Sequence, residues 1–184
     1  GTEKGVYRST NNGESWIKHG INSIAISGMI RLVNGNLIAI APLNGVYRSS
    51  NNGDTWIASN SGITDNRLHS ITTNSEGHIF VGSYHQKVFR STDDGVTWSN
   101  VYTGSGCCTI TALVVDTIGN IYIGTYGSGV FRSTNNGINW YQLDIGLSNS
   151  CSIMALILDS LGNIYLGERD VGVRKSTDNG ESWV

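Results

Sequence analysis

Short runs of apolar residues alternate with polar, glycine-containing turns along the whole chain. An apolar run such as ITALVVD or IMALILD leads to an Asp-x-x-Gly-Asn turn, and a second run such as NIYIGT follows. A third run of the form GVFRS or GVYRS then leads to a polar turn that ends at a tryptophan. No stretch keeps the helical period of about 3.6 residues, so the pattern predicts short antiparallel β-strands and no long helix.

This pattern is repeated along the chain. Five tryptophans recur at intervals of 40, 42, 42 and 43 residues: Trp16, Trp56, Trp98, Trp140 and Trp183. Alignment on Gly35, Gly77, Gly119 and Gly162 then runs without a gap to Val46, Val88, Val130 and Val173. Units of about 42 residues with four short β runs are typical of propeller blades. The sequence therefore predicts an all-β fold, a β-propeller built from four-stranded antiparallel blades.

The unit boundaries predict one propeller domain or segment over residues 1–184. We expect a half-blade at 1–20 and blades at 21–61, 62–103, 104–146 and 147–184. The chain opens at a third strand and ends as a fourth begins, so both ends offer outer strands. Three interpretations are open: a fragment of a larger ring of about five to eight blades, a self-assembling fragment, or a small ring with one end displaced. The first two are favoured.

The polar turn before each tryptophan has a structural interpretation. A short Asp or Asn side chain can accept a hydrogen bond from a backbone N–H two residues on, and the following glycine supplies a positive φ. The acceptor and tryptophan positions are Asn11, Trp16, Asn51, Trp56, Asp93, Trp98, Asn135, Trp140, Asp178 and Trp183. Because Asn replaces Asp in three of the five copies, hydrogen-bond geometry is favoured over calcium binding or acid chemistry.

These five turns resemble the Asp-box, or BNR, repeat of sialidase-like and photosystem-assembly-factor-like β-propellers. The family pattern is Ser-x-Asp-x-Gly-x-Thr-Trp, and only the stretch from Ser91 to Trp98 fits it at every position. The resemblance implies a propeller fold. By analogy with the family, it also implies a location outside the cell or in the envelope of a bacterium.

A basic residue recurs just before each of these turns. The column consists of Arg8, Arg48, Arg90, Arg132 and Lys175. A charge that returns once per blade is interpreted as a structural partner for neighbouring backbone or carboxylate groups. A ligand site would be expected to vary from blade to blade.

Charge and composition remove several classes of function. The net charge is −2 and only 14% of the residues are charged, which gives no case for nucleic acid or an anionic membrane as partner. No apolar run approaches the ~20 residues of a membrane-spanning helix. The stretch GTYGSG, residues 124–129, continues as strand and not as helix, so we expect neither a phosphate-binding loop nor a cofactor.

Histidine and cysteine spacing points to no metal site. His19, His69, His78 and His85 show no ligand spacing, and the three cysteines match no zinc pattern. Free thiols are expected at Cys107, Cys108 and Cys151, with a bridge from the vicinal pair to Cys151 as the alternative.

Functional residues are expected where the repeat varies. The loop between the second and third strands and the loop that links one blade to the next should share one face, opposite the tryptophan-containing turns. Candidate ligand-binding residues on this face are Asp65, Arg67, Tyr84, His85, Tyr126, Arg169 and Asp170, with Asn149 in a further linking loop. Drift of solvated loops is the alternative explanation for the variation.

Three functions follow from these patterns. The favoured one is a non-catalytic interaction or scaffold module that binds a protein or a glycan through this face. The second is a glycoside hydrolase fragment, sialidase-like or xyloglucanase-like. The sialidase constellation of arginines, tyrosine and acids cannot be assembled here, and only Asp65 and Asp170 are placed for the xyloglucanase type. The third is a purely structural fragment that forms homo-oligomers through exposed blade edges.

Overall fold

The computed structural model describes residues 1–104, 108–147 and 151–184, and all regular structure in these residues is β. A two-stranded half-blade consists of β1 (Gly5–Arg8) and β2 (Ile17–Asn22). Blade 1 contains β3 (Gly28–Arg31), β4 (Leu37–Ala41), β5 (Gly45–Ser49) and β6 (Ile57–Ala58). Blade 2 contains β7 (Leu68–Thr73), β8 (Ile79–Ser83), β9 (Lys87–Ser91) and β10 (Ser99–Thr103).

The last two blades continue the same order. Blade 3 contains β11 (Ile110–Val115), β12 (Ile121–Thr125), β13 (Gly129–Ser133) and β14 (Tyr141–Leu143). Blade 4 has three strands, β15 (Ile153–Leu158), β16 (Ile164–Glu168) and β17 (Gly172–Ser176). Beside β17, the backbones of Lys175 and Val184 exchange two hydrogen bonds, where a fourth strand would begin. All pairings within the sheets are antiparallel, as in propeller blades, so the predicted fold class is confirmed.

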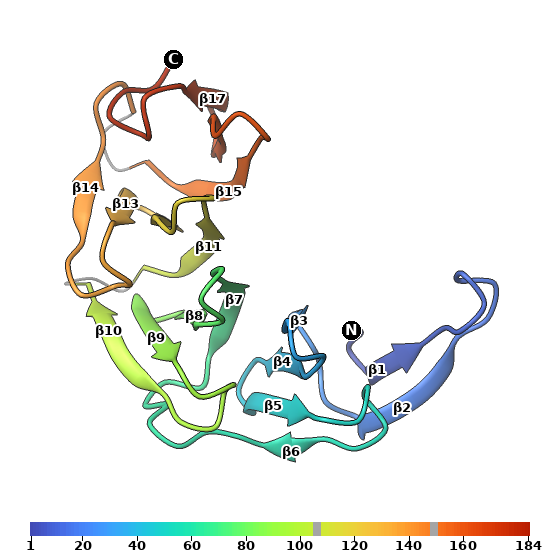
Figure 1. Ribbon diagram of the computed structural model, residues 1–184. Helices are drawn as coiled ribbons and strands as arrows, with labels where there is room; N and C mark the ends of the chain where they lie inside the picture. Colours follow the sequence, from blue (N-terminus) through green and yellow to red (C-terminus); the bar gives the residue numbers. More distant parts are fainter. Residues whose placement is uncertain (105–107, 148–150) are drawn as a thin grey trace.

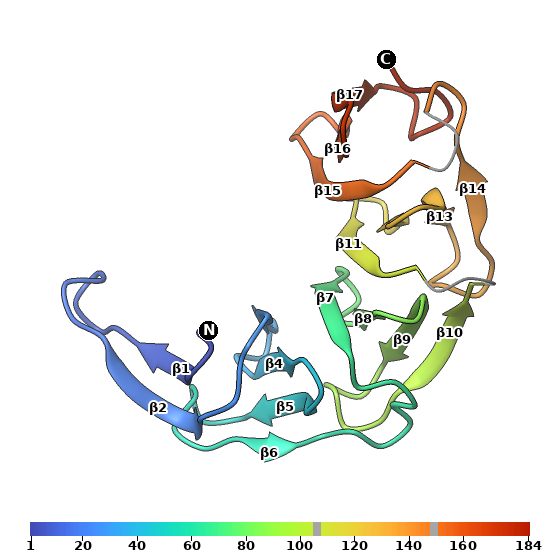
Figure 2. The ribbon, with the colours of Figure 1, turned by 180° about the vertical axis from the view of Figure 1, so that it is seen from behind.

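The blades follow one another along an open arc, with the two chain ends apart (Figures 1 and 2). The first strands β3, β7, β11 and β15 line the inner side of the arc, while β6, β10 and β14 lie on the outer side. The hairpin of β1 and β2 stands at one end of the arc and blade 4 at the other.

The hydrophobic core is divided among the junctions between blades. Successive side chains of a strand point to opposite faces, so each blade gives one apolar set to the blade before it and one to the blade after it. At the junction of blades 1 and 2, Ile38, Ile40 and Val46 meet Val81 and Trp98. Equivalent clusters join the half-blade to blade 1, blade 2 to blade 3, and blade 3 to blade 4.

The two outermost faces of the described arc are uncovered. Val46, Val88 and Val130 are 0% exposed beneath the following blade, whereas Val173 in the same column of blade 4 is 77% exposed. At the opposite end, Trp16 of the half-blade is 62% exposed, whereas Trp98 is 4% exposed. The same residue type is therefore core or surface according to whether another blade covers it.

The tryptophan-containing turns share one hydrogen-bond pattern. Ser91 Oγ accepts from Gly95 N at 2.9 Å and donates to Asp93 Oδ1 at 2.8 Å, and Asp93 Oδ1 also accepts from Thr97 N at 2.9 Å. The backbone donors to Asp93 Oδ1 are thus Val96 and Thr97, three and four residues on, not two residues on as expected. The N–H group two residues after Asp93 belongs to Gly95, and it donates to the Ser91 hydroxyl oxygen instead.

The turn holds two successive left-handed residues. Asp94 has φ 58° and Gly95 has φ 79°. The left-handed residue before the glycine in the other copies is Asn12, Asn52, Asn136 and Asn179. Asn and Asp tolerate this conformation better than other side chains, which explains the adjacent pair of carboxylates in the blade 2 copy.

The arginine column connects each blade to the next. Arg48 Nε donates to the Asp94 carbonyl at 3.0 Å, and Arg90 Nη1 donates to the Asn136 carbonyl at 2.8 Å. Arg8 Nη1 donates to the backbone carbonyl of Asn52, and Arg132 Nη1 donates to that of Asn179, at 2.9 Å each. In the fifth copy, Lys175 Nζ lies over the Tyr165 ring, 5.4 Å from its centroid. The structural partner is therefore a backbone carbonyl in the turn of the following blade. Arg8 and Arg132 also pair with the Asp54 and Glu181 carboxylates of the same turns, at 2.8 and 2.7 Å.

Candidate interaction surface on the loop face

Strand pairing brings two kinds of loop to the same edge of each blade. In blade 2, Leu68 at the start of β7 pairs with Ser83 at the end of β8. The loop that enters the blade therefore lies beside the loop from β8 to β9. Because β9 is antiparallel to β8, its tryptophan-containing turn lies at the opposite edge. We call the first edge, over all blades, the loop face.

A buried carboxylate organises the loop face of blade 2. Asp65 Oδ1 accepts from Arg67 N at 3.2 Å, and Asp65 Oδ2 accepts from His85 N at 3.2 Å. The Nδ1 atom of His85 lies 3.0 Å from Asp65 Oδ2, and since a carboxylate only accepts, Nδ1 carries the proton. The Asp65 side chain is 7% exposed and that of His85 is 49% exposed. The buried Asp65 carboxylate thus fixes the position of the accessible His85 imidazole.

Hydrogen bonds also set the charge of Asp65. Burial alone would raise the pKa of this carboxyl, but donation from the Ser83 side chain and from the backbone N–H groups of Arg67 and His85 outweighs burial. The net result is a lowered pKa. Asp65 is therefore held as an anion and is poorly suited to donate a proton.

Arg67 and Tyr84 complete this group. The Arg67 guanidinium lies over the Tyr84 ring at 5.7 Å from the centroid, and the rings of Tyr84 and His85 meet edge to face at 5.4 Å. Both Arg67 and Tyr84 are exposed. We call Asp65, Arg67, Tyr84 and His85 the Asp65 cluster.

Two further contacts hold the loop that carries this cluster. Asn66 Nδ2 donates to the Leu43 carbonyl at 2.7 Å, and Leu43 N donates to the Asn66 carbonyl at 2.9 Å, which ties the loop to blade 1. On the other side, Lys87 Nζ donates to Thr64 Oγ1 at 3.2 Å. The loop is therefore fixed from both neighbouring segments.

The remaining candidate residues form a second group, between blades 3 and 4. The Arg169 guanidinium lies over the Tyr126 ring at 5.4 Å, and Arg169 Nη1 donates to the Tyr126 hydroxyl. Arg169 also pairs with Asp170, whose carboxylate oxygen is 3.5 Å from Nε. Asp170 is exposed and left-handed, with φ 63°. Among the described residues, Arg169 has an acidic partner and Arg67 has none.

The seven candidate residues thus fall into two groups on different blades, and Asn149 lies outside the described residues. Sequence reasoning did not select Lys87, Thr64 or Ser83. A signal for Lys87 exists, because it stands in a column where the other three blades have glycine: Gly45, Gly129 and Gly172.

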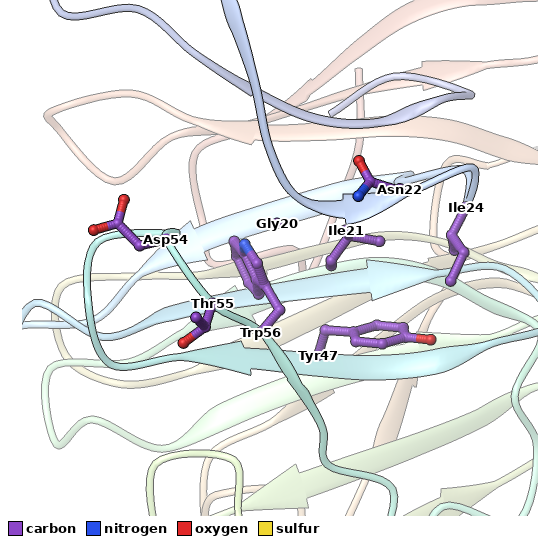
Figure 3. Close-up of a pocket in the computed structure, with 8 residues that line it drawn as sticks. All are labelled: Gly20, Ile21, Asn22, Ile24, Tyr47, Asp54, Thr55 and Trp56. Carbon is purple, nitrogen blue, oxygen red and sulfur yellow. The ribbon is translucent and has the colours of Figure 1, made fainter.

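A pocket of about 330 Å³ lies between the half-blade and blade 1, as Figure 3 shows. Its lining consists of Gly20, Ile21, Asn22, Ile24, Tyr47, Asp54, Thr55 and Trp56. Trp98 and Trp140 donate their indole N–H to Ser59 and Val101 of the preceding blade, at 2.9 and 3.2 Å. Trp140 also donates to the Gly137 carbonyl of its own turn at 3.0 Å, and Trp56 donates to the Gly53 carbonyl of its own turn at 3.0 Å. The pocket extends from the tryptophan-containing turn at Asp54, Thr55 and Trp56 to Asn22 and Ile24, where the chain leaves β2, and none of the candidate ligand-binding residues lines it.

The described ranges contain no group of three or more His, Cys, Asp or Glu side chains able to hold a metal ion. Within the same ranges, no helix is long and apolar enough to cross a membrane. Cys108 and Cys151 are free, and burial, with the nearby Glu168 carboxylate, raises the pKa of the Cys151 thiol. The expectation for Cys107 falls outside the described residues.

Solved structures with the same fold come from proteins of different kinds. The extracellular domain of the putative one-component system BT4673 from B. thetaiotaomicron has 18% identity and a TM-score of 0.78, covering 96% of this chain and 25% of that one. An ancestral GH74 enzyme has 20% identity and a TM-score of 0.84, and the match covers 100% of this chain and 28% of that one. YCF48 bound to D1 peptide has 17% identity and a TM-score of 0.73, and the match covers 96% of this chain and 58% of that one. At these identities the likeness establishes the fold alone.

The chain spans less than two thirds of the length of each of these proteins. No curated protein matches it in sequence. The propeller part of the predicted resemblance is confirmed, and the assignment of the turns to the Asp-box repeat stays a prediction. The family model of the DUF6242 β-propeller domain matches residues 44–152, more than half of the sequence. The chain therefore belongs to the DUF6242 β-propeller domain family.

Proposed function

We propose that this propeller segment is a non-catalytic interaction module that binds a protein or glycan partner through the loop face. The Asp65 cluster is the observation that carries the proposal. A buried carboxylate binds the backbone N–H groups of Arg67 and His85 and the His85 ring, and the Arg67 guanidinium lies over the exposed Tyr84 ring. Side chains that are already ordered lose less entropy on binding, as expected of a recognition surface.

Two structural neighbours support this proposal by analogy. One is the extracellular domain of a putative one-component system, and another is YCF48 in a complex with D1 peptide. The second illustrates peptide binding by a protein of this fold, and the first its presence in an extracellular domain. We extend the first analogy to location and propose that this module acts outside the cell or in a bacterial envelope.

The proposal is tested by binding to a glycan array and to a peptide library, with the 184-residue chain and two variants. Arg67→Ala/Tyr84→Ala removes the exposed part of the Asp65 cluster. Lys175→Ala, near the opposite edge, is the matched control. We expect ligands bound by the parent chain to be lost with the first variant and kept with the second. Equal retention by both variants would count against the loop face.

A glycosidase is the second candidate function, because one structural neighbour is an ancestral GH74 enzyme. This alternative would use Asp65 and Asp170, and the Asp65 carboxylate is committed to internal donors and held as an anion. Hydrolysis of a fluorogenic glycoside panel, lost in Asp65→Ala and in Asp170→Ala, would reverse the order of the two candidates.

A further inference from the structure

The geometry points to a carboxylate-binding site formed by Arg67 and Lys87 beside His85, which takes an acidic segment of a partner polypeptide. This inference rests on the proposed function and names the ligand chemistry of the same face.

Asp65 exposes almost none of its carboxylate at the outer surface. Its side chain is 7% exposed, and its two oxygens already accept from two backbone N–H groups, from the His85 ring and from the Ser83 side chain. A carboxylate with this many donors is satisfied and does not need an arginine or lysine partner. A ligand that approaches from solvent therefore meets the donors around Asp65 and not Asp65 itself.

Three cationic or protonatable side chains flank the loop that carries Asp65. Within the described residues, neither Arg67 nor Lys87 makes an ion pair. Arg67 contacts the Tyr84 ring, and Lys87 contacts the Thr64 hydroxyl. His85, whose Nδ1–H is directed to Asp65, presents Nε2 as a hydrogen-bond acceptor, so the cations of the site are Arg67 and Lys87. An exposed guanidinium without a carboxylate partner, supported by a ring, is suited to bidentate binding of a carboxylate.

The surroundings favour a peptide carboxylate over an acidic sugar. A sugar ring would bind best by stacking on a free aromatic face, and Tyr84 is the exposed aromatic residue of the cluster. Arg67 already covers one face of its ring, and His85 meets it edge to face. The Tyr84 ring therefore serves to position Arg67, and charge-assisted hydrogen bonds become the main means of recognition.

The second arginine–tyrosine pair provides an internal comparison. Arg169 lies over Tyr126 as Arg67 lies over Tyr84, at 5.4 and 5.7 Å. Arg169, however, is paired with Asp170 at 3.5 Å. The two sites share the stacking and differ in the neighbouring carboxylate. Arg169 is thus a matched control for Arg67.

The test is fluorescence anisotropy with fluorescein-labelled hexaglutamate and, as a neutral control, hexaglutamine, at low ionic strength. The proteins are the 184-residue chain, Arg67→Gln, Lys87→Gln and Arg169→Gln, each checked for native circular dichroism. We expect hexaglutamate to bind in preference to hexaglutamine, and Arg67→Gln to weaken its binding about tenfold, the effect of one charge-assisted contact. Lys87→Gln should weaken binding in the same direction, and Arg169→Gln should change it less than about twofold.

Several results would overturn the inference. Absence of hexaglutamate binding, or equal losses in Arg67→Gln and Arg169→Gln, would exclude a specific carboxylate site. Binding of polygalacturonate in place of hexaglutamate would assign the site to an acidic glycan. Equal binding of hexaglutamine and hexaglutamate, lost on Arg67→Ala/Tyr84→Ala, would remove the carboxylate chemistry while leaving the proposed function of the loop face intact.

Discussion

Asp93 and Asn51 occupy the same place in two successive turns and make nearly the same bonds. Each Oδ1 accepts from the backbone N–H four residues on, at 2.9 Å in both copies. The other side-chain atom differs: Asn51 Nδ2 donates to Thr55 Oγ1 at 2.8 Å, whereas Asp93 Oδ2 accepts from Thr97 Oγ1 at 2.6 Å. A threonine hydroxyl can donate or accept, so it serves either partner. Because the hydroxyl adapts to either side chain, Asp and Asn can replace each other at this position of the turn.

The turn geometry makes a direct prediction for Asp93. Asp93→Asn should keep the contacts of this side chain with Ser91, Val96 and Thr97 and change the free energy of unfolding by less than about 0.5 kcal/mol at neutral pH. Asp93→Ala removes the acceptor and should cost about 1–2 kcal/mol, as loss of a capping side chain does. Urea denaturation of the three proteins measures both values. A large loss in Asp93→Asn would show that charge matters in this turn.

Acid should weaken these turns. In Asp178, hydrogen bonds from the Ser182 and Ser176 side chains lower the pKa to about 2. In Asp93, burial opposes the shift, but hydrogen bonds from Thr97 and Ser91 prevail and the pKa is lowered. A folded-state pKa below the unfolded value of about 3.9 means that this stabilisation is complete above that pH and is lost as the pH falls through the folded-state pKa.

We therefore expect the urea midpoint of the chain to fall between about pH 4 and pH 2. The double variant Asp93→Asn/Asp178→Asn should show a shallower fall over the same range, since an amide does not titrate. If the urea midpoints of the two proteins fell equally with pH, titration of Asp93 and Asp178 would not be the cause of the fall.

Arginines connect neighbouring blades at the scale of the elements. Arg90 is half-buried and donates to the Asn136 carbonyl of the next blade at 2.8 Å. We expect Arg90→Gln to lower the free energy of unfolding by about 1.5–3 kcal/mol, the range for a hydrogen bond with a charged partner. Lys175→Gln is the control, because Lys175 contacts the Tyr165 ring of its own blade. Thermal or urea unfolding checks the pair, and similar losses in both would refute an inter-blade role.

Local features of the fold could be read from the sequence, and contacts between blades could not. Strands and turns follow from short-range alternation and from the Asn-Gly steps, which the chain repeats in register. The carbonyl partner of Arg90 lies 46 residues away, and nothing in the arginine column identifies it.

The candidate site divides in the same way. Asp65, Arg67, Tyr84 and His85 were predicted together because they depart from the repeat on one edge. The burial of Asp65 was not predictable, since it depends on the close approach of two loops that are distant in sequence. Lys87 was missed because a lysine at the start of a strand gives no chemical signal by itself.

At the scale of the whole molecule, the uncovered end faces should govern association of the 184-residue chain. Val173 and Ile157 are 77% and 64% exposed on a face whose counterparts in blades 1 to 3 are covered by the next blade. We expect light scattering to show mass that rises with concentration, and Val173→Asp to reduce the rise. Ile118→Asp, at a 79% exposed turn position of blade 3, is the control. A constant monomer mass in all three proteins would contradict this expectation.

The junctions between blades have a consequence for the energetics of the fold. Within the described residues, each apolar cluster and each arginine bond joins a blade only to its immediate neighbour. The free energy of folding is then a sum of one contribution per blade and one per junction, as in a one-dimensional Ising chain. Insertion or deletion of a complete unit would change stability by a single increment, so this architecture can gain or lose blades without redesign of those that remain.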